Sequence, residues 1–297
     1  MFHFLPPLVK GLLSISLYLI NTIVITVPLI FASFFKFLIP NQAFIIFIDK
    51  VLIWMATLWI QVNSINTKLF CSIEWDIRGL KNLKSKEWYL VISNHQSWVD
   101  ILVLQTVLNK KIPMLKFFLK KELIWIPFLG LAWWALDFPF MRRYSKKKLA
   151  QKPHLKGKDL ASTKKACGKF KHTPVSIINF VEGTRFTPDK KKQQNNVFTH
   201  LLTPKAGGIA FVLNSMGDYL HTLIDITIVY PDGIPTFLDF TCGRVHRIIV
   251  DFEVLPITDS IKGDYFNSSA DKKEFYIWLN DLWQKKDQKI KTIKMQL

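Results

Sequence analysis

The chain has 297 residues, of which 49% are hydrophobic and 21% are charged, and its formal net charge is +18. These values exclude a disordered chain and a polytopic transporter, and the length favours one large domain with an appendage. The surplus of lysine indicates an anionic partner. The three cysteines are too few and too scattered for a disulfide framework or a C-x-x-C metal site, so we expect a reducing compartment and no structural zinc.

The first 65 residues are predicted to form a membrane anchor. Residues 11–35 contain no charged side chain, and about 25 helical residues cross a hydrocarbon core roughly 30 Å thick. A cleaved signal peptide is the alternative, but its apolar region is normally shorter and ends in a small-x-small site. Residues 43–62 carry Asp49 and Lys50 near their middle, so we expect this second stretch to pair with the first as a hairpin or to lie in the membrane interface.

Residues 66–297 form the second predicted unit, an α/β domain that the positive-inside rule places on the cytoplasmic face of the cell (inner) membrane. Strands are predicted at residues 72–80, 87–94, 174–183, 221–230, 235–240 and 245–255. Helices are predicted at residues 99–110, 205–216 and 271–293. Strands that alternate with helices favour a mixed, mostly parallel sheet flanked by helices.

The sequence SNHQSWVD, residues 93–100, lies between a predicted strand and a predicted helix. Ser97 and Asp100 have the spacing of a helix cap, which leaves His95 on the preceding turn. The Asp100 carboxylate can then accept a hydrogen bond from one imidazole nitrogen and leave the other free as a general base. Taken alone, the spacing favours a plain helix cap with His95 as a turn residue, and Ser97 lacks the surroundings of a nucleophile elbow.

The sequence INFVEGTRFTP, residues 178–188, follows another predicted strand. Gly183 permits a tight turn, and the Arg185 guanidinium offers a planar fork suited to a phosphate. Glu182 can orient Arg185 or bind a substrate hydroxyl. Alone, this string also fits a β-turn with a surface salt bridge.

The combination of H-x4-D and E-G-T-R motifs behind an apolar N-terminus resembles the 1-acylglycerol-3-phosphate acyltransferase family over about residues 70–230. NHQSWVD is similar to the family's first block, FMRR at residues 140–143 to the second, with Arg143 equivalent by register, and VEGTRF to the third. Val181 stands where the family often has Pro, and ITIVYPDG at residues 226–233 matches the fourth block loosely. TPKAGG at residues 203–208 is similar to the branch that acts on varied lysophospholipids.

The resemblance implies transfer of a fatty acyl chain from acyl-CoA or acyl carrier protein to the free hydroxyl of a lysophospholipid such as lysophosphatidate. It implies catalysis by His95 and Asp100 without a metal or cofactor. The acceptor-binding residues that it implies are Glu182, Gly183, Thr184, Arg185 and Arg143. The alternatives are a membrane-bound thioesterase or esterase that uses the same His–Asp pair, and a membrane protein that binds anionic lipid without catalysis.

Residues 123–138 are apolar and rich in Trp, but Pro127 and Gly130 interrupt them and they are too short to span a bilayer. They fit the wall of an acyl-chain groove, an element that dips into the interface, or a buried core helix.

Residues 142–173 hold two arginines and ten lysines against one aspartate. This composition fits a solvated loop, and beside a membrane it attracts anionic lipid, at about 1 kcal/mol per basic side chain. Nucleic-acid binding is disfavoured because no stacking aromatic lies between Tyr144 and Phe170.

Overall fold

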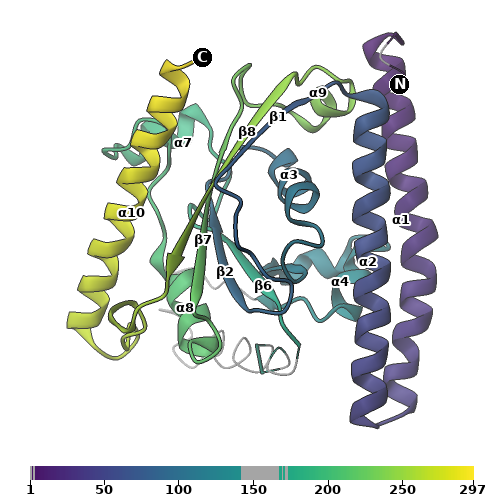
Figure 1. Cartoon of the computed structure of the whole chain (residues 1–297), viewed down its shortest axis with the longest axis horizontal. Helices are drawn as coiled ribbons and strands as arrows, with labels where there is room; N and C mark the ends of the chain where they lie inside the picture. The colour runs from purple at the N-terminus through teal and green to yellow at the C-terminus, as the bar shows by residue number, and fades with distance from the viewer. Residues whose placement is uncertain (1, 3, 142–166, 169, 171–172) are drawn as a thin grey trace.

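The computed structural model describes residues 2, 4–141, 167–168, 170 and 173–297 (Figure 1). The N-terminal and central elements are α1 (Pro7–Leu38), α2 (Gln42–Phe70), β1 (Glu74–Arg78), β2 (Tyr89–Ser93), α3 (Val99–Leu108), β3 (Leu115–Phe117), β4 (Leu119–Lys120), the 3-10 helix η1 (Lys121–Trp125), α4 (Leu129–Ala135) and β5 (Phe140–Met141). The remaining elements are β6 (Ser176–Phe180), α7 (Pro188–Gln194), α8 (Ala206–Met216), β7 (Thr222–Val229), α9 (Phe237–Thr241), β8 (Arg247–Pro256), the 3-10 helix η4 (Asp259–Ile261) and α10 (Ser269–Met295).

Six strands form the main sheet in the order β1-β8-β7-β2-β6-β3. Four neighbouring strands are mutually parallel: β7, β2, β6 and β3. β8 pairs with β7 in the antiparallel direction, and β1 pairs with β8 in the parallel direction. The carboxyl ends of β2, β6 and β7 therefore meet at one edge of the sheet. In an open sheet of this kind, ligands bind at the carboxyl ends of the parallel strands.

Both faces of the sheet are covered by helices (Figure 1). One core contains the apolar side chains of α8 and α10, and the other contains those of α3 together with Phe240 of α9. All five residues of β2 are buried, as expected for a central parallel strand. The predicted mixed, mostly parallel sheet flanked by helices is confirmed.

The helices α1 and α2 form a long hairpin that lies against the α/β domain (Figure 1). Inside the hairpin, Asn21 Nδ2 donates to Asn63 Oδ1 over 2.7 Å. Near the start of α1, Gly11 lies so close to Cys242 that a Cβ on it would fall 2.5 Å from the Cys242 Sγ. Further along, the rings of Tyr18 and Phe237 lie 6.0 Å apart, and near the end of α1 Lys36 Nζ lies 2.9 Å from Asp137 Oδ2. The hairpin thus contacts the domain along most of its length.

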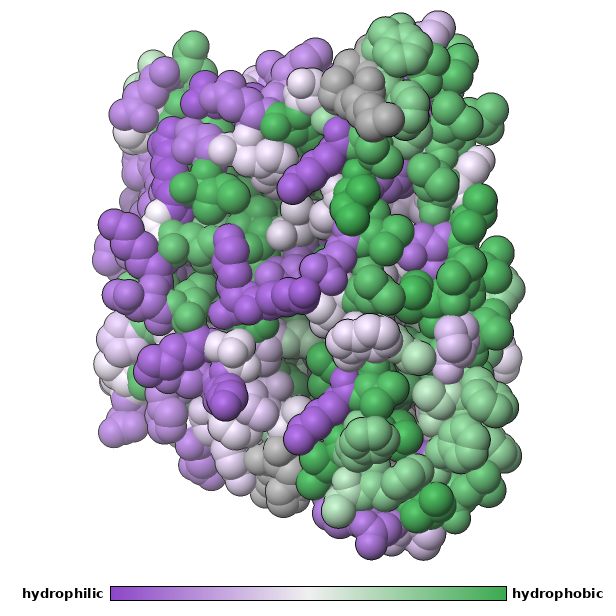
Figure 2. Space-filling view, turned by 45° about the vertical axis from the view of Figure 1, so that its right-hand side comes forward, coloured by the Kyte–Doolittle hydropathy of each residue, from purple (hydrophilic) through white to green (hydrophobic). Residues whose placement is uncertain are grey.

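Both hairpin helices are long and apolar enough to cross a membrane. Their outward sides are largely exposed, and the side of the molecule that they form is mostly hydrophobic, whereas the opposite side is largely hydrophilic (Figure 2). Asp49 pairs with Lys36 over 2.6 Å, which offsets part of the cost of placing a charge in this apolar stretch.

One predicted element is wrong. Residues 235–240 are predicted to form a strand, but the structure has the short helix α9 there. Thr236 and Asp239 form a capping box, in which each side chain accepts a hydrogen bond from the other's backbone amide. This local bonding starts a helix and outweighs the strand preference of the aromatic residues.

Candidate active site

The loop after β2 carries His95 at the carboxyl edge of the sheet. Asn94 fixes the start of this loop, because its amide donates to the Ile228 carbonyl and accepts from the Ile228 amide, each over 2.9 Å. His95 Nδ1 lies 2.8 Å from Asp100 Oδ2, as the sequence predicts. With its proton on Nδ1, the neutral ring has a free lone pair on Nε2.

Asp100 is almost completely buried and is held by four hydrogen bonds. Besides His95, Oδ2 accepts from the backbone amides of Gln96 at 2.6 Å and Ser97 at 2.9 Å. The Tyr230 hydroxyl donates to Oδ1 over 2.6 Å. These donors stabilise the ionised carboxylate, which in turn fixes the orientation of the imidazole.

The start of α3 has the bonding that the Ser97–Asp100 spacing predicts. Ser97 Oγ accepts from the Val99 amide over 3.1 Å, and the Asp100 carboxylate caps the Ser97 amide. The Ser97 hydroxyl donates to the Pro235 carbonyl over 2.5 Å, so it also ties this turn to the loop after β7. Asp100, in the first turn of α3, therefore both accepts from the amide that precedes the helix and pairs with His95.

The turn after β6 carries the second motif. Gly183 has φ of +67°, in the left-handed region that glycine adopts without strain. Glu182 is fully buried, and neither carboxylate oxygen makes a well-formed hydrogen bond with the described residues. Burial raises the pKa of Glu182 to about 8, and the backbone amide of His95 and the charge of Lys286 lower it less strongly. Glu182 thus lies beneath the His95 loop and does not face solvent.

Arg185 is exposed at this turn, and its guanidinium carbon lies 4.6 Å from the centroid of the Trp98 ring. Two lysines lie beside it. Lys190 Nζ donates to Thr184 Oγ1 over 2.8 Å and to the Arg185 carbonyl over 2.9 Å. Lys205 Nζ lies 3.3 Å from the position that a Cβ on Gly183 would occupy. Three cations therefore gather at the turn, which favours an anionic ligand.

The two motif loops are in direct contact. The Phe186 amide donates to the His95 carbonyl over 2.8 Å. The His95 ring stacks on Phe180, the last residue of β6, with centroids 3.9 Å apart. The structure thus brings His95, Asp100, Glu182, Gly183, Thr184 and Arg185 together at one edge of the sheet, whereas the predicted Arg143 lies outside the described residues.

Sequence reasoning missed Tyr230, which holds Asp100 from the end of β7. The available signal was its position: it follows a buried strand, as His95 and Glu182 do, and the ends of parallel strands meet. In the described part of the chain, no group of three or more His, Cys, Asp or Glu side chains is arranged to hold a metal ion.

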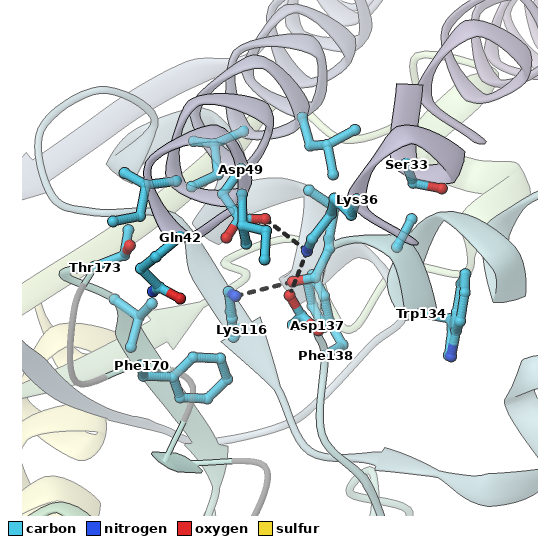
Figure 3. Close-up of a pocket in the computed structure, with 17 residues that line it drawn as sticks. Ser33, Lys36, Gln42, Asp49, Lys116, Trp134, Asp137, Phe138, Phe170 and Thr173 are labelled. Carbon is cyan, nitrogen blue, oxygen red and sulfur yellow. Dashed lines mark hydrogen bonds and ion pairs between the residues drawn. The ribbon is translucent and has the colours of Figure 1, made fainter. Parts of the chain in front are cut away.

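A cavity of about 440 Å³ lies between the helical hairpin and the α/β domain (Figure 3). Apolar side chains of α2 and of residues 134–138 form much of its wall, including Ile46, Leu52 and Phe138. Lys36 also lines it and is paired with Asp49 and Asp137. A row of stacked rings connects Phe138 through Phe117 and Phe180 to His95.

Comparisons with known proteins identify relatives of this chain. Lysocardiolipin acyltransferase 1 of Mus musculus is 25% identical over 217 residues, which cover 68% of this chain and 53% of that protein. 1-acyl-sn-glycerol-3-phosphate acyltransferase delta of Homo sapiens is 25% identical over 229 residues, which cover 73% of this chain and 56% of that protein. The chain therefore spans little more than half the length of these relatives.

A solved structure has a similar fold. The 1-acyl-sn-glycerophosphate (LPA) acyltransferase of Thermotoga maritima matches with a TM-score of 0.53 and 17% identity, over 96% of this chain and 98% of that one. The Acyltransferase family model matches residues 74–231, which include both motif loops and Tyr230. On that match, which covers more than half of its length, the chain belongs to the Acyltransferase family.

Proposed function

We propose that this protein transfers a fatty acyl chain from a thioester donor to the free hydroxyl of a lysophospholipid. The observation that carries the proposal is the His95–Asp100 hydrogen bond beside the cationic turn at Arg185. The names of the relatives point the same way, since they act on lysocardiolipin or 1-acyl-sn-glycerol-3-phosphate.

In the proposed reaction, His95 Nε2 removes the proton of the acceptor hydroxyl as its oxygen attacks the thioester carbonyl. The C–O bond forms, the tetrahedral intermediate collapses, and the C–S bond breaks with the electron pair on sulfur. The imidazolium then returns its proton to the thiolate. Asp100 stabilises the imidazolium through Nδ1, and Tyr230 and two backbone amides hold Asp100 in place.

The acceptor's phosphate is proposed to bind at Arg185, because a guanidinium grips phosphate oxygens through two parallel hydrogen bonds. Lys190 and Lys205 add positive charge beside it. Thr184 is proposed to contribute through its hydroxyl, which already accepts from Lys190. Glu182 is proposed to support the turn from beneath, since its side chain has no exposed surface.

The acyl chain is proposed to occupy the cavity between the hairpin and the domain. Its volume falls in the range of roughly 300–1,000 Å³ that is usual for pockets that bury small ligands. Residues 134–138 of the Trp-rich segment line it, which fits the predicted acyl-chain groove. The donor is proposed to be acyl-CoA or acyl carrier protein.

The basic segment 142–173, for which the sequence suggests a solvated loop or a contact with anionic lipid, lies almost entirely outside the described residues.

The hairpin is proposed to anchor the protein in the cell membrane, with the α/β domain on the cytoplasmic face. A pose that crosses the bilayer would carry the domain to membrane depth, because the domain contacts α1 both near its start, at Gly11, and near its end, at Lys36. We therefore favour a hairpin that lies within one leaflet, with its exposed apolar side toward the lipid tails.

The test is thiol release from a long-chain acyl-CoA by the detergent-purified chain, with and without a panel of lysophospholipids. The expected result is release that depends on the acceptor and is lost in His95→Ala. A matched control is His246→Ala, which replaces an exposed histidine just before β8. Release without any acceptor would identify a thioesterase instead, and unchanged release in His95→Ala would overturn the mechanism.

A further inference from the structure

The segment of η1 and α4 exposes large apolar side chains beside the hairpin. Trp125 is 84% exposed, Leu131 is 48% exposed and Trp134 is 44% exposed, and Phe128 is also exposed. Leu131 and Trp134 are three residues apart, so they project from one side of α4, and Phe128 is the residue just before that helix. We call these four residues the η1–α4 patch. Their exposure excludes the buried core helix that the sequence left open.

The opposite side of α4 is packed against the hairpin. Ala132 and Ala135 are buried in a cluster with Leu29 of α1 and Leu52 of α2. The element is therefore fixed between the hairpin and the domain, and the η1–α4 patch is its outward side. An apolar patch of this kind marks an interaction surface.

We infer that the η1–α4 patch inserts into the bilayer interface beside the hairpin, so that the α/β domain itself touches lipid. The occupant is a lipid bilayer for two reasons. α4 packs against α1, whose Phe31 is 66% and Phe34 is 56% exposed. Its two tryptophans, Trp125 and Trp134, are of the residue type that favours the headgroup region of a membrane. The exposed Lys120 and Lys121 precede the patch, and their charge suits an anionic membrane surface.

The inference rests on the proposed placement of the hairpin in one leaflet and extends the lipid contact to a second element. Trp134 also lines the cavity proposed for the acyl chain. In Figure 3 it lies apart from the paired charges of Lys36, Asp49 and Asp137. The patch thus borders the cavity, and lipid at the patch would be adjacent to that site.

The test uses the full chain reconstituted in nanodiscs of phosphatidylcholine and phosphatidylglycerol, with and without brominated acyl chains that quench fluorescence. An environment-sensitive thiol probe is attached in separate Trp125→Cys and Leu131→Cys variants. Phe31→Cys on α1 reports the hairpin, and Ile277→Cys on α10, an equally apolar exposed position, is the matched control. The wild-type chain gives the labelling background of its three buried cysteines.

The expected result is quenching at residues 125 and 131 comparable to that at residue 31 and several-fold stronger than at residue 277. Quenching at residue 31 without quenching at 125 and 131 would overturn the inference while leaving the hairpin anchor standing. A blue-shifted but unquenched probe at 125 would assign the patch to a protein partner or a second copy, and would also overturn it. Absence of quenching at residue 31 would refute the hairpin placement on which the inference rests.

Discussion

The guanidinium of Arg185 lies over the indole ring of Trp98, with 4.6 Å between the guanidinium carbon and the ring centroid. Trp98 stands just before α3 and Arg185 follows β6, so this contact joins the two motif loops from the solvent side. A cation over an aromatic face is attracted by the negative potential of that face, which limits the positions that the Arg185 guanidinium takes up. Trp98 is thus placed to orient Arg185.

Trp98→Ala should raise the KM for the phosphate-bearing acceptor by roughly 2- to 5-fold, because an exposed cation–π contact contributes about 0.5–1 kcal/mol. kcat should change little if Arg185 binds the ground and transition states equally. Trp98→Phe should restore most of the affinity. Steady-state kinetics against acceptor concentration checks this, and an equal loss in the Phe and Ala variants would contradict an orienting role for the ring.

Arg185→Ala should raise the same KM by roughly 10- to 100-fold, since hydrogen bonds to charged groups contribute about 1.5–3 kcal/mol. The matched control is Arg244→Ala, which removes an exposed arginine near α9 that pairs with Asp239. The control should retain the wild-type KM. An Arg185→Ala enzyme with an unchanged acceptor dependence would remove this residue from the proposed phosphate site.

Tyr230→Phe should lower kcat about tenfold with a small effect on the KM values. The substitution removes the donor to Asp100 Oδ1 and leaves a buried acceptor without its partner, which costs about 1–3 kcal/mol. The thermal midpoint should fall as well. Tyr276→Phe is the control, because its hydroxyl pairs with Tyr265 at an exposed position of α10. A Tyr230→Phe enzyme with wild-type kcat would show that the amides alone suffice to hold Asp100.

The positions of the motif residues could be predicted because they follow apolar strands. β2 and β6 are buried runs with clear ends, so the sequence places His95 and Glu182 after parallel strands. The pairing of His95 with Asp100, five residues later, follows from local spacing. Tyr230 could not be assigned a role in this way, because its bond to Asp100 joins residues 130 positions apart and depends on the strand order β7-β2-β6.

Other features depend on tertiary contacts that periodicity does not encode. The Trp98–Arg185 stack requires the loops after β2 and β6 to be neighbours. The burial of Glu182 depends on groups distant in the sequence, such as the His95 loop and Lys286 of α10, whereas the short motif alone permits an exposed carboxylate. For α9, the signal is present in the T-x-x-D spacing of Thr236 and Asp239, which is typical of a helix start rather than of the predicted strand.

Glu182→Gln should change how stability depends on pH. Burial raises the pKa of Glu182 to about 8 from its ordinary value of 4.5. Between these values the folded chain keeps a proton that the unfolded chain has released. The free energy of unfolding therefore falls as pH rises through this window, by up to about 1.4 kcal/mol per pH unit from this group.

Glutamine does not titrate, so the thermal midpoint of Glu182→Gln relative to wild type should increase from pH 5 to pH 8. Differential scanning fluorimetry of both proteins in the same detergent measures this difference at each pH, which cancels the contributions of the other carboxylates. A difference that stays constant over the window would mean that Glu182 is ionised in the folded protein at pH 5.

Lys286 of α10 should be important for stability, because its ammonium group is buried beneath the sheet. Its Nζ lies 2.5 Å from Asp225 Oδ1 of β7 and donates to the Ile226 carbonyl over 2.7 Å. Burial lowers the pKa of Lys286 and raises that of Asp225, while their attraction opposes both shifts. Lys286→Met leaves Asp225 buried without its cation, which should cost about 3–5 kcal/mol of unfolding free energy.

The neighbouring Lys285 provides a matched control on the same helix. It pairs with Asp281 at the surface, where both side chains are more than half exposed, so Lys285→Met should barely change the thermal midpoint. The double variant Asp225→Val/Lys286→Met should recover much of the loss, because replacing both members of a buried pair with apolar side chains is often neutral. Equal midpoints for Lys286→Met and Lys285→Met would mean that water reaches Asp225 and that α10 does not seal this side of the sheet.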